Sequence, residues 1–350
     1  MTPAERPVLF LWSFSPWSNK IVAYLALRGI PYARCEQPIV LPRPDLEALG
    51  VNYRRVPVIS LGRDIYCDSL LCIEKLEEIY PGSEGGYKAL SAQNNTEFAL
   101  EKLLEKWTDV VVFKPAAAVI PTSLDLMKDP AFQKDREELW GRSWSPEAQE
   151  ALRPAALADM RAMFQFLENV LSDGRQWILG SNEPRLADIH SCWIFDWLFQ
   201  LPGAFPEEFF SKQQFPKTHA WRDRYNAAIA EAKEDAPKPD ELEGKDAVKQ
   251  ILSADFVDRD IRVEADPSGL KEGQEVDMFP NDTGYTRKDS GRLIKLTASE
   301  AVVSTKSKQD GQEMRIHYPR WNFTIVPKSK KAETNDGGAA PQNGHVLPVQ

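Results

Sequence analysis

The sequence predicts a multidomain α+β protein, with a small α/β domain, an all-helical domain and a small all-β module in that order. Three observations predict this fold class. Strand-like runs and helix patterns alternate up to residue 84, helical periodicity alone continues to residue 236, and short alternating runs separated by turn signals follow residue 254. A chain of 350 residues has room for two or three domains.

The first unit, residues 5–84, is expected to have the order β-α-β-β-β-α. Strands are expected where apolar residues are dense, at residues 7–12, 32–39, 56–61 and 65–67. Helices are expected over residues 16–28 and 69–80. Ser15 and Pro16 are typical of a helix start, and Gly29 is typical of a helix end, so the bounds of the first helix are the best defined.

The second unit, residues 91–236, is expected to be all-helical. Helical periodicity runs through residues 93–114, 147–171, 186–198 and 217–232. The insertion at residues 120–145 contains two prolines and two tryptophans. We hypothesise that this insertion forms a wall or a cover of a pocket.

The last part of the chain is expected to contain a linker, a β-rich module and a tail. Residues 237–254 begin rich in Pro and acidic residues, which is typical of a linker. Residues 255–328 are expected to form a small β-rich module, such as an SH3-like or other small barrel. Residues 329–350 have few apolar residues and are expected to be disordered.

Charge is unevenly distributed over this last part. Residues 241–286 contain five basic and twelve acidic residues, whereas residues 287–331 contain eleven basic and four acidic ones. Either the two blocks attract each other or they present two different faces. The net charge of the whole chain is −9, so general binding of nucleic acid is not expected, because an acidic surface repels phosphate.

The number and spacing of the cysteines and histidines limit which compartment and which cofactors can be expected. The four cysteines form no C-x-x-C pair, and the four histidines are far apart, so neither a disulfide framework nor a metal site is expected. No apolar run reaches the length of about 18 residues that a membrane-spanning helix needs. We therefore expect a reduced, cytoplasmic protein without a membrane partner; the short basic run at residues 328–331 is a weak hint of nuclear import.

A candidate site begins at Ser15, which is placed at the N-cap of the first helix. A thiolate bound there would meet free backbone N–H groups, the positive helix end and a hydroxyl donor. A helix end contributes about 0.3–2 kcal/mol for a charge and a hydrogen bond to an anion about 1.5–3 kcal/mol, enough to ionise most of a bound thiol near neutral pH. The alternative is a common Ser-Pro helix cap without chemistry.

Two further features surround the strand predicted at residues 56–61. If the Val56–Pro57 bond is cis, the preceding backbone turns outward and can pair with an extended peptide; the alternative is an ordinary edge proline. Arg43 and Arg55 are two cations that can pair with a terminal carboxylate; the alternative is that both are solvated.

The last feature is Asp68-Ser69, at the start of the helix predicted at residues 69–80. Ser69 and its backbone N–H are suited to hold a carboxylate, and Asp68 to accept from a ligand ammonium group. The alternative is that Asp68 only caps the helix. Cys67, the preceding residue, is either a thiol near the site or, as we favour, a buried cysteine at a strand end.

Together these features resemble the thioredoxin-like N-terminal domain of glutathione transferases. SPWSNKI at residues 15–21 resembles the S-x-x-S-x-[KR]-[IV] pattern of the serine-type members, including the tau and zeta classes. RVPV is similar to the cis-proline segment of the family, and Asp68-Ser69 to its E/Q-S glutathione-binding pair. The resemblance covers residues 7–235, and fungal glutathione-transferase-like proteins, some from secondary-metabolite pathways, are the most similar in character.

The helical half also resembles this family. LG followed by PRLADI at residues 179–189 resembles the segment L-x-G…P-S-x-A-D-I. Arg185 stands where the family has a Ser or Thr that caps the helix, so one half of the reciprocal bond is lost, while Asp188 can still reach back to backbone N–H groups. The resemblance implies the all-α glutathione-transferase C-terminal domain.

The resemblance implies a glutathione-dependent transferase, with glutathione as co-substrate and a small hydrophobic electrophile as second substrate. Ser15 would donate to the glutathione thiolate, and Val56, which precedes Pro57, would pair with the cysteinyl backbone. The remaining polar residues would hold the two ends of the tripeptide: Asp68 and Ser69 the γ-glutamyl end, Arg55 and Arg43 the glycyl carboxylate. The candidates for the electrophile pocket are Trp17, Trp107 and Val111, with ordinary core as the alternative for each.

Two other functions remain open at this point. One is a glutathione-dependent isomerase or lyase in a biosynthetic or degradative route, and the other is a non-catalytic binding protein that kept the fold and gained a β-rich recognition module. Serine in place of cysteine at residue 15 disfavours a disulfide reductase. The family further implies a role in detoxification and a homodimer.

Overall fold

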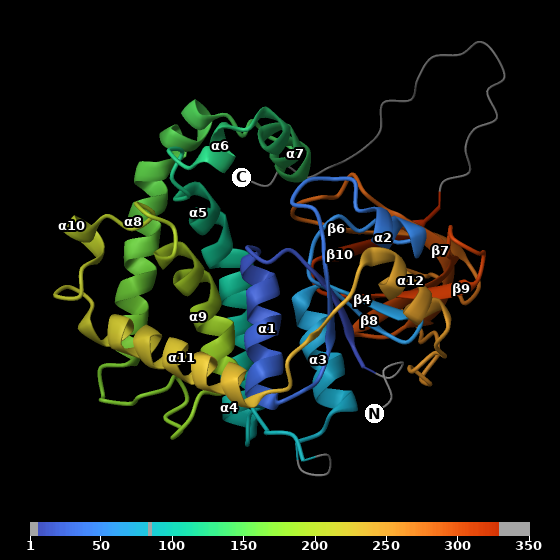
Figure 1. Cartoon of the computed structure of the whole chain (residues 1–350), viewed down its shortest axis with the longest axis horizontal. Coiled ribbons are helices and arrows are strands. Elements are labelled where there is room, and N and C mark those ends of the chain that lie inside the picture. The colour runs from blue at the N-terminus through green and yellow to red at the C-terminus, as the bar shows by residue number, and fades with distance from the viewer. Residues whose placement is uncertain (1–5, 83–85, 329–350) are drawn as a thin grey trace.

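The computed structural model describes residues 6–82 and 86–328, and Figure 1 shows how the parts are arranged. The helices of residues 95–235 gather on one side, and strands from both ends of the chain lie together on the other side. None of the helices in the described ranges combines the length and apolarity needed to cross a membrane. The tail predicted at residues 329–350 lies outside the described residues.

The first domain has the predicted order of elements and one additional short helix. Its elements are β1 (Val8–Leu11), α1 (Pro16–Arg28), β2 (Ala33–Glu36), α2 (Pro44–Ala48), β3 (Val58–Leu61), β4 (Asp64–Cys67) and α3 (Ser69–Ile79). Helix α1 has the predicted bounds: Ser15 is its N-cap and Gly29 ends it at a φ of 68°. The sequence does not predict α2, because five residues with one buried side chain leave no apolar periodicity.

The strands of this domain form a sheet whose two faces belong to two different cores. Strand β1 pairs in parallel with β2 and antiparallel with β3, and β3 pairs antiparallel with β4. Because side chains alternate along a strand, Leu9 and Leu11 face the core shared with the helical domain, whereas Val8 and Phe10 face a second core. Burial on both faces explains why the sequences of β1 and β3, VLFL and VISL, are almost continuously apolar.

The helical domain contains all four predicted segments, with differences at two places. Its elements are α4 (Asn95–Lys106), a π-helical segment (Trp107–Val112), α5 (Phe113–Ala118), α6 (Asp125–Lys128), α7 (Pro130–Trp140), α8 (Pro146–Val170), α9 (Leu186–Phe199), α10 (Glu207–Phe210) and α11 (Pro216–Asp235). The helix predicted at residues 93–114 is interrupted by the π-helical segment. The insertion at residues 120–145 folds into α6 and α7.

The start of α9 is held by one buried carboxylate. Asp188 accepts hydrogen bonds from the backbone N–H of Arg185 at 3.0 Å, from the N–H of Ile178 at 2.9 Å and from the indole N–H of Trp221 at 2.9 Å. Burial raises the pKa of Asp188 to about 6. The expectation that Asp188 reaches back to backbone N–H groups is confirmed.

The prediction of a free linker at residues 237–254 is wrong, because this segment is folded onto the first domain. Strand β5 (Asp240–Glu241) pairs in parallel with β2, and helix α12 (Gly244–Leu252) follows it directly. Val248 and Ile251 of α12 are buried in the second core, which also contains Leu46 of α2. The Pro-rich start of the segment concealed this short amphipathic helix.

The β-rich module at residues 255–328 is present, but the expectation of a separate barrel is wrong. Its strands are β6 (Glu275–Pro280), β7 (Asp289–Leu296), β8 (Glu300–Lys306), β9 (Glu313–Pro319) and β10 (Phe323–Pro327). Strand β9 pairs in parallel with β4, so within residues 6–82 and 86–328 one sheet of ten strands has the order β10-β6-β7-β8-β9-β4-β3-β1-β2-β5. Without β9, strand β4 would be an edge with unpaired backbone groups. We call residues 237–328 the extension.

The two charge blocks attract each other, as one of the two sequence interpretations expected. Lys295 of the basic block lies 2.8 Å from Asp258 of the acidic block, and Arg320 lies 2.8 Å from Asp266. These ion pairs join neighbouring parts of the extension. Part of the uneven charge therefore forms ion pairs within the extension.

Candidate functional site

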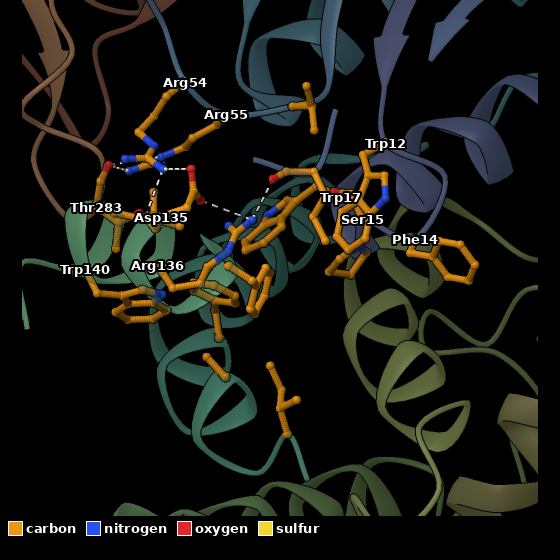
Figure 2. Close-up of a pocket in the computed structure, with 18 of the residues that line it drawn as sticks. Trp12, Phe14, Ser15, Trp17, Arg54, Arg55, Asp135, Arg136, Trp140 and Thr283 are labelled. Carbon is orange, nitrogen blue, oxygen red and sulfur yellow. Dashed lines mark hydrogen bonds and ion pairs between the residues drawn. The ribbon is translucent and has the colours of Figure 1, made fainter. Parts of the chain in front are cut away.

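One cavity of about 570 Å³ collects most of the predicted site residues. It lies between the first domain, helix α7 and the extension, and Figure 2 shows part of its lining. Eight of the predicted residues line it: Ser15, Trp17, Arg43, Arg55, Val56, Pro57, Asp68 and Ser69. Trp107 and Val111 do not line it. Each of these sequence features alone was weak evidence for a binding site, but in the structure they line the same cavity.

Ser15 is the N-cap of α1, and its hydroxyl is at the cavity. The Ser15 Oγ accepts a hydrogen bond from the backbone N–H of Ser18 at 3.3 Å, while the Ser15 N–H donates to the carbonyl of Trp12 at 2.8 Å. Within the described part of the chain no acceptor takes the hydroxyl proton of Ser15. The hydroxyl can therefore cap the helix and donate to a ligand at the same time.

Val56 and Pro57 present backbone groups to the cavity. The Val56–Pro57 peptide bond is cis. Among residues 6–82 and 86–328, neither the N–H nor the carbonyl of Val56 has a hydrogen-bond partner. Because a backbone donor and acceptor normally find partners, an extended ligand that pairs with Val56 would satisfy both.

Asp68 and Ser69 form the start of α3, and each has an unusual feature. Asp68 caps the helix by accepting from the N–H of Leu70 at 3.0 Å, and its φ of 76° is in the left-handed region, where non-glycine residues are strained. Burial raises the pKa of Asp68. Ser69 is 2% exposed, and its buried Oγ has no hydrogen-bond partner within the described residues. The capping interpretation of Asp68 holds, and the hydroxyl of Ser69 is available to a ligand.

Arg43 and Arg55 line the cavity, but both already have partners, so neither is the solvated cation of the alternative interpretation. Arg43 donates to the carbonyl of Pro38 at 3.2 Å and to the carbonyl of Arg54. Arg55 forms an ion pair with Asp282 of the extension and donates from Nε to the carbonyl of Thr283 at 3.1 Å. The extension therefore reaches into the lining of the cavity and neutralises Arg55.

Trp107 and Val111 lie away from the cavity. Both belong to the π-helical segment that interrupts the helix predicted at residues 93–114. The ring of Trp107 packs 4.9 Å from that of Phe166, and Val111 is 52% exposed. Trp17 lies in the cavity lining, with its ring 4.2 Å from that of Phe113.

Asp109 is a lining residue that the sequence interpretation missed. It accepts a hydrogen bond from the indole N–H of Trp17 at 3.3 Å, and it lies 3.5 Å from the ammonium group of Lys20. Burial raises the pKa of Asp109 to about 6, although Lys20 opposes this shift. Lys20 is the sequence signal that could have pointed to Asp109, because a lysine within the apolar pattern of a buried helix requires an acidic partner.

Helix α7 supplies a second wall of the cavity. Its lining residues recur at the spacing of one helix face: Phe132, Asp135, Arg136, Leu139 and Trp140. The rings of Phe113 and Trp140 are stacked at 5.4 Å, and Trp140 is stacked on Trp144 at the same distance. With Trp17, these rings make a continuous aromatic wall.

Hydrogen bonds tie α7 to the first domain and to the extension. Asp135 accepts from the N–H of Leu41 at 3.2 Å, and Arg136 donates to the carbonyl of Ile39 at 2.8 Å. The N–H of Gly284 donates to the carbonyl of Leu139 at 2.7 Å. The cavity is thus bounded by three parts of the chain that are far apart in the sequence: the first domain, α7 and the extension.

A second buried group of charges lies at the junction of β4 with the extension, and we call it the junction cluster. Its members are Asp64, Lys75, Asp258, Lys295, Glu300 and His317. His317 bridges Glu300 at 2.7 Å and Asp64 at 3.1 Å, and Lys295 lies 2.7 Å from Glu300. Burial alone would lower the pKa of His317, but hydrogen bonds to the two carboxylates raise it.

The junction cluster has the donor set of a metal site but not the charge of one. Asp258, Glu300 and His317 offer ligand atoms within 4.8 Å of one another. Lys295 and Lys75 already neutralise these carboxylates, at distances of 2.7 and 3.2 Å from Glu300. A divalent cation would have to displace two ammonium groups, so the residues fit an ionic joint better than a metal centre.

The four cysteines are buried and free, and none of them lines the cavity. Burial raises the pKa of Cys67 well above its usual value. A thiol of this kind is mostly protonated and unreactive at neutral pH. The favoured interpretation of Cys67 as a buried strand-end residue is confirmed.

Comparisons with known proteins agree with this architecture. Residues 9–84 match a family model described as glutathione S-transferase, N-terminal domain, and residues 115–234 match one described as a domain of unknown function, DUF7962. A probable glutathione S-transferase of Nicotiana tabacum is 23% identical over 239 residues, which cover 68% of this chain and 91% of that protein. The probable glutathione S-transferase GSTU6 of Oryza sativa subsp. japonica is 23% identical over 230 residues, covering 65% and 86%.

A solved structure extends the similarity into the extension. A GST-like protein from Pseudomonas syringae has a TM-score of 0.71 at 23% identity, covering 92% of this chain and 100% of that chain. Coverage this high includes most of the extension, so the same combination of domains occurs in that bacterial protein. The fold is that of the glutathione transferases with a β-rich C-terminal extension, and the comparisons support the glutathione S-transferase superfamily for this chain.

Proposed function

We propose that this protein is a serine-type glutathione-dependent transferase, which activates the glutathione thiolate for attack on a small, hydrophobic electrophile. One observation carries the proposal: the Ser15 hydroxyl, the unpaired backbone of Val56 and the unpartnered Ser69 hydroxyl line one cavity. They match the three requirements of a bound tripeptide thiol, namely a donor to sulfur, a backbone partner and a donor to a carboxylate. The relatives named as probable glutathione S-transferases support the same reaction class.

In this proposal the chain binds and polarises the nucleophile and forms no covalent bond itself. The backbone of Val56 pairs with the cysteinyl unit, and Ser69 with the N-terminus of α3 holds the γ-glutamyl carboxylate, while Asp68 accepts from the ammonium group. Ser15 donates to the sulfur, and the N-terminus of α1 stabilises its negative charge. The aromatic wall then holds the electrophile.

Arg55 and Arg43 remain the proposed partners of the glycyl carboxylate, with one modification. Asp282 already pairs with Arg55, so a ligand carboxylate has to share or displace that contact. Arg43 is buried behind two backbone carbonyls. We therefore expect the glycyl end to contribute less to binding than the γ-glutamyl end.

Asp109 favours a second candidate function, a glutathione-dependent isomerase or lyase. A carboxyl group at the cavity with a pKa of about 6 can accept or release a proton near neutral pH. Isomerisation returns the glutathione, whereas conjugation consumes it. Titration of free thiols during turnover distinguishes the two.

The test of the main proposal combines calorimetry and turnover. Glutathione is titrated into the protein, and conjugation is assayed with a generic aryl halide. Ser15→Ala is expected to reduce turnover roughly tenfold to a hundredfold, the value of one hydrogen bond to an anion. The same change removes a helix cap, which costs about 0.5–2 kcal/mol of stability, so thermal unfolding is measured in parallel.

Ser13→Ala is the matched control. The hydroxyl of Ser13 donates to Glu36 at 2.6 Å, and Ser13 does not line the cavity. Its removal is expected to leave turnover unchanged. Equal turnover of the wild type and Ser15→Ala would remove Ser15 from the mechanism, and failure of glutathione to bind would end the proposal.

A further inference from the structure

The charged residues of the cavity are unevenly paired. Among the described residues, four arginines and four aspartates line it. Arg55 is paired with Asp282, Asp109 lies 3.5 Å from Lys20, and Asp68 caps α3. Arg43 donates to the carbonyls of Pro38 and Arg54. These groups have their partners within the fold or serve the proposed tripeptide site.

The charged lining residues that remain carry an excess of positive charge. We call them the arginine cluster: Arg54, Asp135 and Arg136. Asp135 is the shared carboxylate, at 2.9 Å from Arg54 and 3.4 Å from Arg136. Arg54 also lies 3.5 Å from Glu138, but Glu138 is 39% exposed and is shared with Arg287 at 2.9 Å. The two guanidinium groups therefore depend mainly on one buried carboxylate.

Arg136 Nε is buried without a hydrogen-bond partner in the described part of the chain, and Arg54 Nη1 has only Glu138, at 3.5 Å. The side chain of Arg54 is only 3% exposed. Burial, together with the neighbouring guanidinium group of Arg54, lowers the pKa of Arg136 to about 10. An anion placed between these groups would satisfy the open donors and offset the cost of burying them.

The arginine cluster adjoins the aromatic wall. Phe132, Arg136 and Trp140 are spaced four residues apart along α7, so they lie on one face of this helix. Figure 2 shows Arg54, Arg136 and Trp140 on one side of the cavity, with Ser15 and Trp17 on the other. The aromatic wall and two guanidinium groups thus lie side by side in the lining of the cavity.

We propose that the cavity takes a planar aromatic ligand bearing a carboxylate, with its ring on the aromatic wall and its carboxylate at the arginine cluster. The proposal deepens the proposed function, on which it rests, because it assigns this chemistry to the second substrate. The cavity of about 570 Å³ is of the size that holds small organic ligands. An uncharged aromatic compound would leave the open guanidinium donors unsatisfied.

The test uses two probes that differ in charge, 2-naphthoate and 2-naphthylmethanol, and measures both by calorimetry. The wild type is expected to bind 2-naphthoate roughly tenfold to a hundredfold more tightly, as a charge-assisted hydrogen bond implies. Arg136→Gln is expected to abolish this preference. Arg142→Gln is the matched control, because Arg142 lies 5.3 Å from the Trp140 ring and 5.1 Å from the Trp144 ring but does not line the cavity.

Arg136→Lys is a second variant, which keeps the test informative if Arg136→Gln does not fold. It keeps the charge but loses the planar fork, so its preference is expected to lie between those of the wild type and Arg136→Gln. If Arg136→Gln does not fold, an Arg136→Lys preference equal to that of the wild type contradicts the proposal. Equal affinity of the wild type for both probes also overturns it.

A competition experiment separates this proposal from the tripeptide site. Glutathione is titrated alone and then in the presence of saturating 2-naphthoate. Binding of both at once is expected. Displacement of 2-naphthoate by glutathione would mean that the arginine cluster serves the tripeptide carboxylate, which overturns the inference and keeps the proposed function. Binding of 2-naphthoate without any glutathione binding would instead contradict the proposed function.

Discussion

The junction cluster and the arginine cluster are both buried groups of charges between distant parts of the chain, but their charges are balanced differently. In the junction cluster three carboxylates face Lys75, Lys295 and the imidazole of His317, and the closest contacts are 2.7 Å. In the arginine cluster two guanidinium groups share Asp135, and Arg136 Nε has no hydrogen-bond partner among the described residues. A balanced group holds the fold together, whereas an unbalanced group at a cavity is suited to an incoming ligand.

The largest expected effect comes from unbalancing the junction cluster. Lys295→Met removes a cation that is 3% exposed and leaves Asp258 and Glu300 without their nearest partner. We expect the free energy of unfolding to fall by about 3–5 kcal/mol, as for other broken buried pairs. Lys308→Met, at an exposed position of the same extension, is the control in urea unfolding and is expected to change little. A loss below about 1 kcal/mol for Lys295→Met would show that the cluster behaves like a surface pair.

A change of pH is expected to have an intermediate effect on the free energy of unfolding, through the titration of His317. The folded-state pKa of His317 is raised above its unfolded value, so the stabilisation is complete below about pH 6.5 and is lost as the pH rises through the raised pKa. One proton changes stability by at most about 1.4 kcal/mol per pH unit. Urea unfolding between pH 6 and pH 9 is expected to show a steeper decline for the wild type than for His317→Gln. Parallel curves would exclude His317 as the titrating group.

The smallest effect is expected from the Arg55–Asp282 pair, because both side chains are partly solvated, at 20% and 37% exposure. Asp282→Asn is expected to cost only about 0.2–1 kcal/mol of stability. If glutathione binds as proposed, the freed Arg55 should tighten its binding by up to about fivefold. The glycyl ethyl ester of glutathione should gain nothing, and an equal gain for the ester would show that Arg55 does not meet the glycyl carboxylate.

The sequence predicts the first domain well because its signals are local. Ser15, Pro16 and Gly29 lie within a few residues of the helix ends they determine, and α1 begins and ends as predicted. Helix α7 carries the spacing of one helix face, but its lining face includes Asp135 and Arg136, so an apolar pattern alone does not identify it. The π-helical segment leaves no recognised signal, and within it Asp109 lines the cavity whereas Trp107 and Val111 do not.

The sequence does not predict contacts between segments that are far apart in the chain. Asp282 meets Arg55 across 227 positions, and His317 meets Asp64 across 253. Neither pair has a local pattern. The pairing of β9 with β4 brings His317 to Asp64, whereas Asp282 follows β6, which is joined to β9 through β7 and β8. The extension therefore looked like an independent module, although it completes both the sheet and the cavity.

The most direct test of the account is the ionisation of glutathione in the cavity. The thiolate of bound glutathione is followed by ultraviolet difference spectroscopy as a function of pH, in the wild type and in Ser15→Ala. We expect the pKa of the bound thiol to lie below that of free glutathione in the wild type and to return towards the free value in Ser15→Ala, because the donor to sulfur is lost. A bound thiol that titrates like free glutathione in the wild type would contradict the role assigned to Ser15 and the head of α1.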